Sequence, residues 1–294
     1  RTDSSAASDV YKRQVFIEEN MSDNPLLQHM RQETVFVKLP SKGNFYKNKP
    51  NLTDDGEVGV MSMTSADEIA MKIPDALFNG ESTYRVLKSC CPRIEDPREM
   101  PFNDVDAVLM AIRRATYGNE LTVPFKCEKC DKTYDYVQEI DPILASVPML
   151  EDQYIVEIAD LKIFIRPIDL QSSTELQIQA VEQTKIQDNL QAYDGSPENI
   201  KAFQDSMFKV AQSNVNIISR CIYIIETPDG QRVDDPKFID EWINNINVDI
   251  FNTIMARLLT IQTITLNLQM KSECANCKNP FEIPIIIDQA RFFG

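Results

Sequence analysis

Two stretches of the sequence decide the fold: CEKCDKTYDYVQEID at residues 127–141 and CANCKNPFEIPIIID at residues 274–288. They align at a constant offset of 147 residues, so that Tyr134 matches Phe281. In both stretches a Cys-x-x-Cys pair is followed by an alternating apolar and polar run, which is typical of a tight turn leading into a β-strand. The two stretches therefore indicate two copies of one structural unit.

The repeated unit extends upstream of the cysteines. An apolar helical pattern precedes each pair, VDAVLMAIRRA at residues 105–115 and VDIFNTIMARL at residues 248–258. A strand pattern, LTVPFK in the first copy and ITLNLQMK in the second, then leads to the cysteines. The chain is therefore predicted to contain an internal duplication. We expect the apolar faces of the two helices to pack the two copies together.

Each Cys-x-x-Cys turn supplies two thiolates, and two such turns complete the tetrahedron of a structural zinc site. In a zinc ribbon the two pairs are usually about 15 to 20 residues apart, whereas 143 residues lie between the pairs here. The duplication accounts for the long spacing, because two copies related by a pseudo-two-fold axis would bring their turns together. The hypothesis is one structural zinc ion. Its predicted ligands are Cys127, Cys130, Cys274 and Cys277.

Two other interpretations of the paired cysteines stay open. A redox dithiol normally follows a strand and opens a helix, whereas both pairs here are followed by strand patterns. Alternatively, both pairs are hairpin turns whose cysteines serve only as packing residues. The other three of the seven cysteines, Cys90, Cys91 and Cys221, lie in apolar runs and are expected to be buried. An odd number of cysteines is not typical of a disulfide framework.

The sequence lacks the residues of common catalytic sites. His29 is the only histidine, which argues against a Ser-His or Cys-His catalytic pair. No glycine-rich phosphate loop is present among the 8 glycines. A zinc ion held by four thiolates has no open position for water. We therefore predict a non-enzymatic protein with no catalytic residues and no organic cofactor.

Composition and charge disfavour two classes of partner. Hydrophobic residues make up 43% of the chain and charged residues 26%, which is typical of a globular protein. The formal net charge of −15 disfavours binding to nucleic acid, whose phosphates attract basic surfaces. No apolar run approaches the roughly 18 residues that a membrane-spanning helix needs. Neither nucleic acid nor a membrane is therefore a predicted partner.

The predicted fold class is α+β. Residues 1–20 are interpreted as a non-native or disordered leader, because RTDSSAASDVYKRQ has no apolar periodicity and resembles translated adapter sequence. Residues 21–150 would hold an N-terminal strand and loop element and the first cysteine pair. Residues 151–225 would form a hairpin and an insertion of long helices, and residues 226–294 the second cysteine pair. The sequence does not predict an oligomeric state.

Several helix ends and turns can be predicted from local patterns. Ser65 and Glu68 have the spacing of a capping box, and Asn103-Asp104 is expected to cap the helix that follows it. A hairpin is expected to turn at Ala159-Asp160.

The long helices, predicted over residues 169–193 and 199–220, carry many glutamines. Their glutamine-rich faces are either solvated surfaces or coiled-coil-like surfaces for a partner.

Three motifs in the first half of the chain carry a family resemblance. They are LPSKGNFY at residues 39–46, NGESTYRVLKSCC at residues 79–91 and PFNDVDAVLMAIRRATYG at residues 101–118. Together with the Cys-x-x-Cys pair that follows them, they resemble the T4-type bacteriophage baseplate protein family. The resemblance is clearest over residues 35–145.

Members of that family are hub or hub-assembly subunits of contractile tails. The resemblance implies a structural or assembly subunit of the tail baseplate hub that folds in the host cytoplasm and is located in the virion. Its partners would be other baseplate and tail proteins. A zinc-ribbon adaptor for nucleic acid or the transcription machinery, and a CxxC redox protein, are the alternatives.

Overall fold

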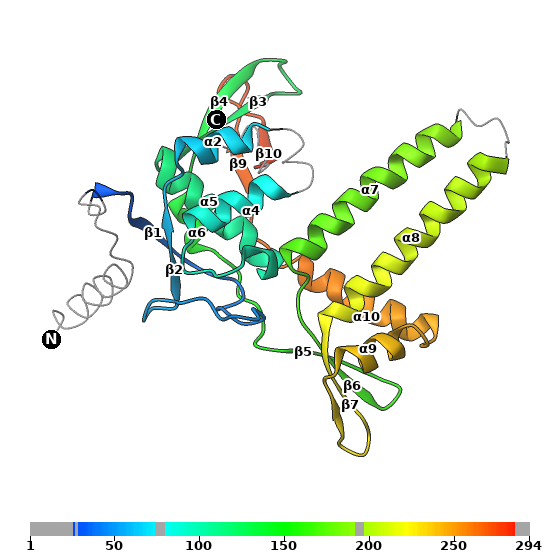
Figure 1. Ribbon diagram of the computed structural model, residues 1–294. Coiled ribbons are helices and arrows are strands. Elements are labelled where there is room, and N and C mark those ends of the chain that lie inside the picture. The colour runs from blue at the N-terminus through cyan, green and yellow to red at the C-terminus, as the bar shows by residue number, and fades with distance from the viewer. Residues whose placement is uncertain (1–25, 27–28, 74–79, 192–196, 286–294) are drawn as a thin grey trace.

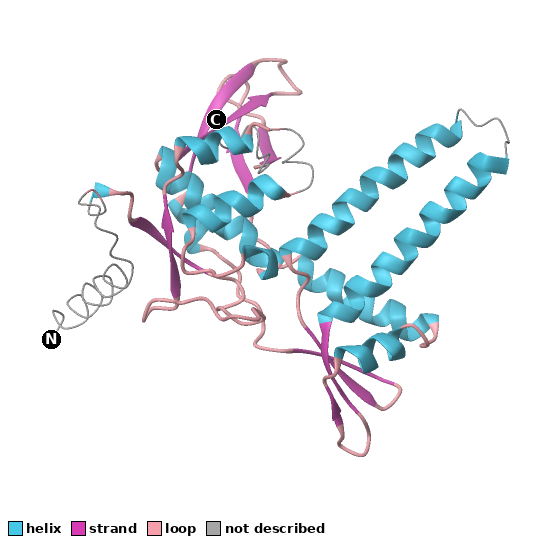
Figure 2. Cartoon of the chain, in the orientation of Figure 1, coloured by secondary structure: helices cyan, strands magenta, loops and turns pink. Residues whose placement is uncertain are grey.

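The computed structural model describes residue 26 and residues 29–73, 80–191 and 197–285. The predicted leader at residues 1–20 and the end of the second repeat, residues 286–288, lie outside the described residues. Within the described part, helices and antiparallel strands are mixed (Figure 2), which confirms the α+β fold class.

The N-terminal element is a two-stranded antiparallel sheet. Strand β1 (Glu33–Lys38) pairs with β2 (Glu57–Met61), and the long loop between them carries the LPSKGNFY motif. Val35 and Val37 are buried on one strand, and Val58 and Val60 on the other. This face packs on the helices that follow.

Those helices are α2 (Ser65–Met71), α4 (Glu81–Cys90), the short 3-10 helix η2 (Pro97–Glu99) and α5 (Phe102–Tyr117). Helix α5 is buried on most sides through its first three turns and contacts both β1 and β2. Gly118 ends α5 with a φ of +94°, a conformation that glycine adopts without a steric penalty.

The capping box of α2 begins one residue earlier than predicted. Thr64 is the N-cap, and its hydroxyl accepts a hydrogen bond of 3.2 Å from the backbone N–H of Asp67. In return, the backbone N–H of Thr64 donates to the Asp67 carboxylate at 2.8 Å. The prediction of Ser65 with Glu68 was therefore wrong. Asp67 takes this position because its carboxylate has further partners on other elements.

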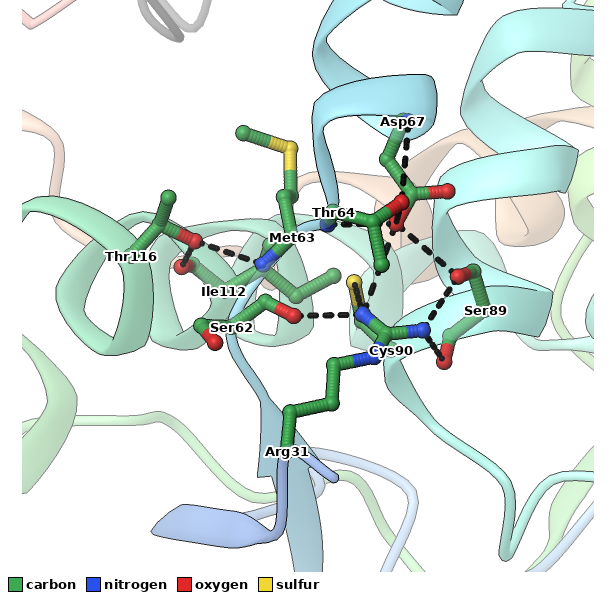
Figure 3. A network of polar contacts seen from close by, with 9 residues as sticks. All are labelled: Arg31, Ser62, Met63, Thr64, Asp67, Ser89, Cys90, Ile112 and Thr116. Atoms are coloured by element: carbon green, nitrogen blue, oxygen red, sulfur yellow. Dashed lines mark hydrogen bonds and ion pairs between the residues drawn. The ribbon is translucent and has the colours of Figure 1, made fainter. Parts of the chain in front are cut away.

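Arg31, which precedes β1, is one of these partners (Figure 3). Its guanidinium forms an ion pair of 3.4 Å with Asp67 and donates to the backbone carbonyls of Ser62 and Ser89. The Ser89 hydroxyl in turn donates to the Asp67 carboxylate at 2.9 Å. This network fixes the residues before β1 to the start of α2 and the end of α4.

Each cysteine pair lies in the turn of a β-hairpin. Strand β3 (Glu120–Lys126) pairs with β4 (Thr133–Glu139), and β9 (Gln269–Glu273) pairs with β10 (Pro280–Pro284). The short helix α6 (Asp141–Ala145) follows the first hairpin. Figure 1 shows the two hairpins beside each other, although they come from distant parts of the sequence.

A four-stranded antiparallel sheet forms the second part of the fold. Its strands β5 (Tyr154–Ile158), β6 (Leu161–Ile165), β7 (Ile222–Glu226) and β8 (Arg232–Val233) follow one another in space. Ala159 and Asp160, with φ of 51° and 63°, make the predicted turn between β5 and β6. Helices α9 (Pro236–Ile243) and α10 (Val248–Gln262) belong to the same part.

Two long helices connect β6 to β7. Helix α7 (Leu170–Gln191) and helix α8 (Pro197–Cys221) run side by side and extend away from the rest of the molecule (Figure 1). We refer to this pair of helices as the arm. The prediction of two long helices is confirmed, and the loop at residues 192–196 lies outside the described residues.

The expected packing of the two repeat helices against each other was wrong. The buried side chains of α5 belong to a first hydrophobic cluster, which β1, β2 and α4 share. Those of α10, among them Ile254 and Leu258, belong to a second cluster with the four-stranded sheet. Each apolar face is therefore covered by its own neighbours, and the two parts of the chain are joined by other contacts.

Candidate metal centre

The first cysteine turn is held by two backbone hydrogen bonds. The N–H of Cys127 donates to the carbonyl of Lys132 at 2.9 Å, and the N–H of Asp131 donates to the carbonyl of Cys127 at 2.8 Å. Asp131 has a φ of 57°, in the left-handed region that tight turns require and that Asp and Asn tolerate best after glycine.

The second turn has the same structure at the matching positions. The N–H of Cys274 donates to the carbonyl of Asn279 at 2.9 Å, and the N–H of Lys278 donates to the carbonyl of Cys274 at 2.9 Å. Lys278 has a φ of 56°. Both hairpins therefore present their two cysteines in the same local geometry.

The fold brings all four predicted ligands into one group. The sulfur atoms of this group, which we call the cysteine cluster, all lie within 4.8 Å of one another. Two of the distances join the hairpins directly, at 3.7 Å for Cys127 to Cys277 and 3.7 Å for Cys130 to Cys274. A tetrahedron with metal–sulfur bonds of about 2.3 Å has edges of about 3.8 Å. The cluster therefore has the size that a tetrahedral thiolate site requires.

Aromatic side chains align the two hairpins beneath the cluster. The ring of Phe125 stacks on Phe281 with 3.9 Å between the centroids, and Tyr136 meets Phe281 edge-on at 4.9 Å. The Tyr136 hydroxyl also donates to the carbonyl of Glu273 at 3.3 Å and accepts from the N–H of Ala275 at 3.1 Å. These contacts hold the second turn opposite the first.

Burial differs within the cluster. Cys127 and Cys274 are buried, whereas Cys130 and Cys277 are half-buried. The backbone N–H of Cys277 lowers the pKa of the Cys274 thiol to about 6. The N–H of Asn279 acts in the same direction on Cys277, but desolvation and the neighbouring thiols raise its pKa to about 11. Of these two thiols, Cys274 is therefore the one that the surrounding protein favours as a thiolate.

The remaining cysteines lie away from the cluster, and their predicted burial is confirmed. Desolvation raises the pKa of Cys90 to about 11 and that of Cys221 to about 12, and it also raises the pKa of Cys91. These thiols are unsuited to nucleophilic or redox chemistry because they stay protonated. Over the described part of the chain, the cysteine cluster is the one group of three or more ligand side chains close enough to hold a metal ion.

Sequence reasoning missed a buried carboxylate. Asp104 was expected to cap α5, but the helix begins at Phe102 and Asp104 is fully buried inside it. Its two oxygens accept hydrogen bonds from the backbone N–H and hydroxyl of Ser41, at 2.8 and 2.5 Å, and from the hydroxyl of Tyr46, at 2.8 Å. Burial raises the pKa of Asp104 to about 6, although the hydrogen bonds from Ser41 and Tyr46 lower it.

Asn103, the other residue that was expected to cap the helix, connects the first hydrophobic cluster to the second. Its side-chain amide donates to the carbonyls of Ile261 and Ile264, at 2.9 and 2.8 Å, at the end of α10. The sequence carried only a weak signal for both residues: they are polar side chains next to the apolar run that begins at Val105, and a buried polar side chain needs a hydrogen-bond partner.

A sequence model of the T4 bacteriophage base plate protein family matches residues 30–294 of the chain. The chain belongs to this family. No curated protein and no solved structure gives a significant match. Membership places this baseplate protein in the virion tail as a structural subunit that contacts other phage tail proteins. None of the described helices combines the length and the apolar character needed to span a bilayer.

Proposed function

We propose that this baseplate protein is a structural or assembly subunit of the tail baseplate hub, and that one zinc ion bound by the cysteine cluster fixes its structure. The observation that carries the metal site is the spacing of the four sulfur atoms, with two distances of 3.7 Å between the hairpins. The match to the baseplate family over residues 30–294 supports the role in the tail.

Four thiolates favour zinc in a structural rather than a catalytic role. Tetrahedral sulfur sites suit zinc or an iron–sulfur centre, and a zinc ion with four protein ligands has no position left for substrate or water. Binding would add directly to the stability of the fold, because the unfolded chain does not hold the four sulfurs together. This agrees with a non-enzymatic protein whose family is structural.

We further propose that the two hairpins are copies of one zinc-ribbon-like unit. Support comes from the matched backbone hydrogen bonds at Cys127 and Cys274, and from the positive φ of Asp131 and Lys278. The proposed units at residues 21–150 and 226–294 each contribute one hairpin, and residues 151–225 lie between them.

The experiment that tests the metal site measures metal content per chain by mass spectrometry, on protein purified without added metal. We expect one zinc per chain in the wild type and in the control Cys90→Ala, and none in Cys274→Ser or Cys127→Ser. A wild-type protein that folds without metal and keeps the four thiols of the cysteine cluster free would contradict the proposed metal site. Iron in place of zinc would support the proposed ligands but contradict the proposed identity of the metal.

The hub role needs a separate experiment. A labelled chain should be located at the centre of purified tail baseplates by electron microscopy. If the chain is absent from mature tails but the hub fails to assemble without it, it is an assembly factor. A label at the baseplate periphery would contradict the hub assignment.

A further inference from the structure

Over residues 201–214, the described outer part of α8 buries few of its side chains. At the base of α8, Ile217, Ile218 and Cys221 are buried in the second hydrophobic cluster. Farther out, between Lys201 and Asn214, Val210 is the one buried residue among the side chains that the structure describes. Helices in proteins obtain most of their stability from burying one face. The described outer part of α8 therefore has an uncovered face on the side away from its buried and half-buried residues.

One face of this outer half has a large aromatic side chain at its centre. Phe208 is 71% exposed, the highest value among the exposed large hydrophobic side chains of the described residues. Exposed polar and charged residues surround it at helical spacing on the same face. We call this set the outer α8 face, and it consists of Lys201, Gln204, Asp205, Phe208, Lys209 and Gln212.

This region is not acidic, although the chain as a whole is. Residues 201–216 carry two lysines and one aspartate, whereas the whole chain has a net charge of −15. Most other residues of the stretch are uncharged polar or apolar. The core of a protein interface is typically depleted in charge and enriched in aromatic residues and methionine. Phe208 and the neighbouring Met207, which is 46% exposed, fit this composition.

The charges of the outer α8 face are complementary to themselves. Asp205 lies between Lys201 and Lys209, four residues from each, and none of the three forms an ion pair within the described part of the chain. In an antiparallel pair of α8 helices, Asp205 of each copy can lie opposite Lys209 of the other. A two-fold axis then passes at position 207, one residue from Phe208. Both aromatic rings would lie next to the axis.

We propose that the outer α8 face binds a second copy of this chain, with the two α8 helices antiparallel about a two-fold axis. Such an interface uses the same surface on both copies, which is the commonest arrangement in homodimers. It covers Phe208, forms two Asp205–Lys209 ion pairs and brings together regions that are not acidic on two acidic chains. It also assigns a role to the glutamine-rich helix faces, and it does not depend on the metal site.

Sedimentation equilibrium of the full-length chain tests the proposal, over a range of about 1 to 100 μM, where weak homodimers dissociate. The wild type should show a reversible monomer–dimer equilibrium. Phe208→Ala should raise the dimer dissociation constant at least tenfold, since two rings lose their cover. Phe238→Ala is the matched control, because Phe238 on α9 is similarly exposed, at 61%, but lies outside the proposed face.

A charge exchange separates this interface from other causes of association. Asp205→Lys should weaken the dimer, because it places two lysines opposite each other, and Asp205→Lys combined with Lys209→Asp should restore it. Helix content measured by circular dichroism checks that the arm stays folded in each variant. A wild type that is monomeric over the whole range would overturn the proposal. So would a dimer that is insensitive to Phe208→Ala, or one that the double exchange does not restore.

Discussion

Replacing Asp104 by Asn changes how the stability of the protein depends on pH. The carboxylate is fully buried and accepts three hydrogen bonds from Ser41 and Tyr46. Asn has nearly the same shape but does not titrate. The Asn side-chain oxygen can accept a hydrogen bond from the Ser41 N–H. The hydroxyls of Ser41 and Tyr46 can rotate to accept hydrogen bonds from the Asn side-chain NH₂ group. The variant should therefore fold, and it isolates the titration of this one group.

The magnitude follows from the pKa. Burial raises the pKa of Asp104 from 3.8 to about 6 in the folded protein. Because the folded value is the higher one, the folded state binds the proton more tightly than the unfolded state. The stability due to this group is therefore fully present below the unfolded pKa and is lost as the pH rises through about 6. Two pKa units at about 1.4 kcal/mol each give about 3 kcal/mol.

The assay is urea unfolding followed by circular dichroism, on the wild type and Asp104→Asn, at intervals from about pH 4 to about pH 7, on either side of the expected transition. The free energy of unfolding of the wild type minus that of the variant should fall by about 2 kcal/mol across this range, because at about pH 4 more than half of this carboxyl is already ionised in the unfolded chain. Any loss of metal at low pH affects both proteins and cancels in the difference. Asp55→Asn, at an exposed loop position, controls for the change in net charge. A difference that is constant, or that grows with pH, would refute the reasoning.

Three further predictions concern contacts between distant segments. Asn103→Ala removes the side-chain donor of the Ile261 and Ile264 carbonyls, of which the Ile261 carbonyl keeps the Ile264 N–H, and should lower the free energy of unfolding by about 2 kcal/mol in urea titrations. Arg31→Met removes the ion pair of a buried Asp67 carboxylate and should cost about 2 to 3 kcal/mol, measured in the same way, whereas an unchanged stability would contradict the network of Figure 3. A zinc chelator should lower the melting temperature of the wild type but not that of Cys274→Ser, and an equal response of both proteins would contradict the metal site.

Local patterns predicted the parts of the fold that depend on neighbouring residues. The turn at Ala159-Asp160 was found because strand patterns lie on both sides of it, and both residues have the positive φ of a tight hairpin turn. The two cysteine turns were found because strand patterns flank them on both sides. The cysteine cluster itself is a long-range contact, and the predicted internal repeat is what indicated it. Without that prediction, the 143 residues between the pairs would have argued against a shared site.

Prediction failed where a side chain has a partner far along the chain. Periodicity shows that the helices at residues 105–115 and 248–258 have apolar faces, but it does not show which element covers each face. The capping box shifted by one residue because Asp67 also binds Ser89 and Arg31, and only the folded structure reveals those partners. Statistical preferences for helix caps rank Ser and Thr close together, so they do not decide between the adjacent Thr64 and Ser65.

The first turn of α5 shows why the motif PFNDVDAVLMAIRRATYG has its particular polar residues. Pro101 forms a β-bridge with Asp169 at the base of the arm, and the Phe102 N–H donates to the carbonyl of Ile168. Asn103 reaches the end of α10, and Asp104 reaches the LPSKGNFY loop. Four consecutive residues thus join the N-terminal loop, the arm and the second hydrophobic cluster. Because each contact crosses between distant segments, this turn holds these parts of the chain together, as the cysteine cluster does separately in the turns of the β3–β4 and β9–β10 hairpins.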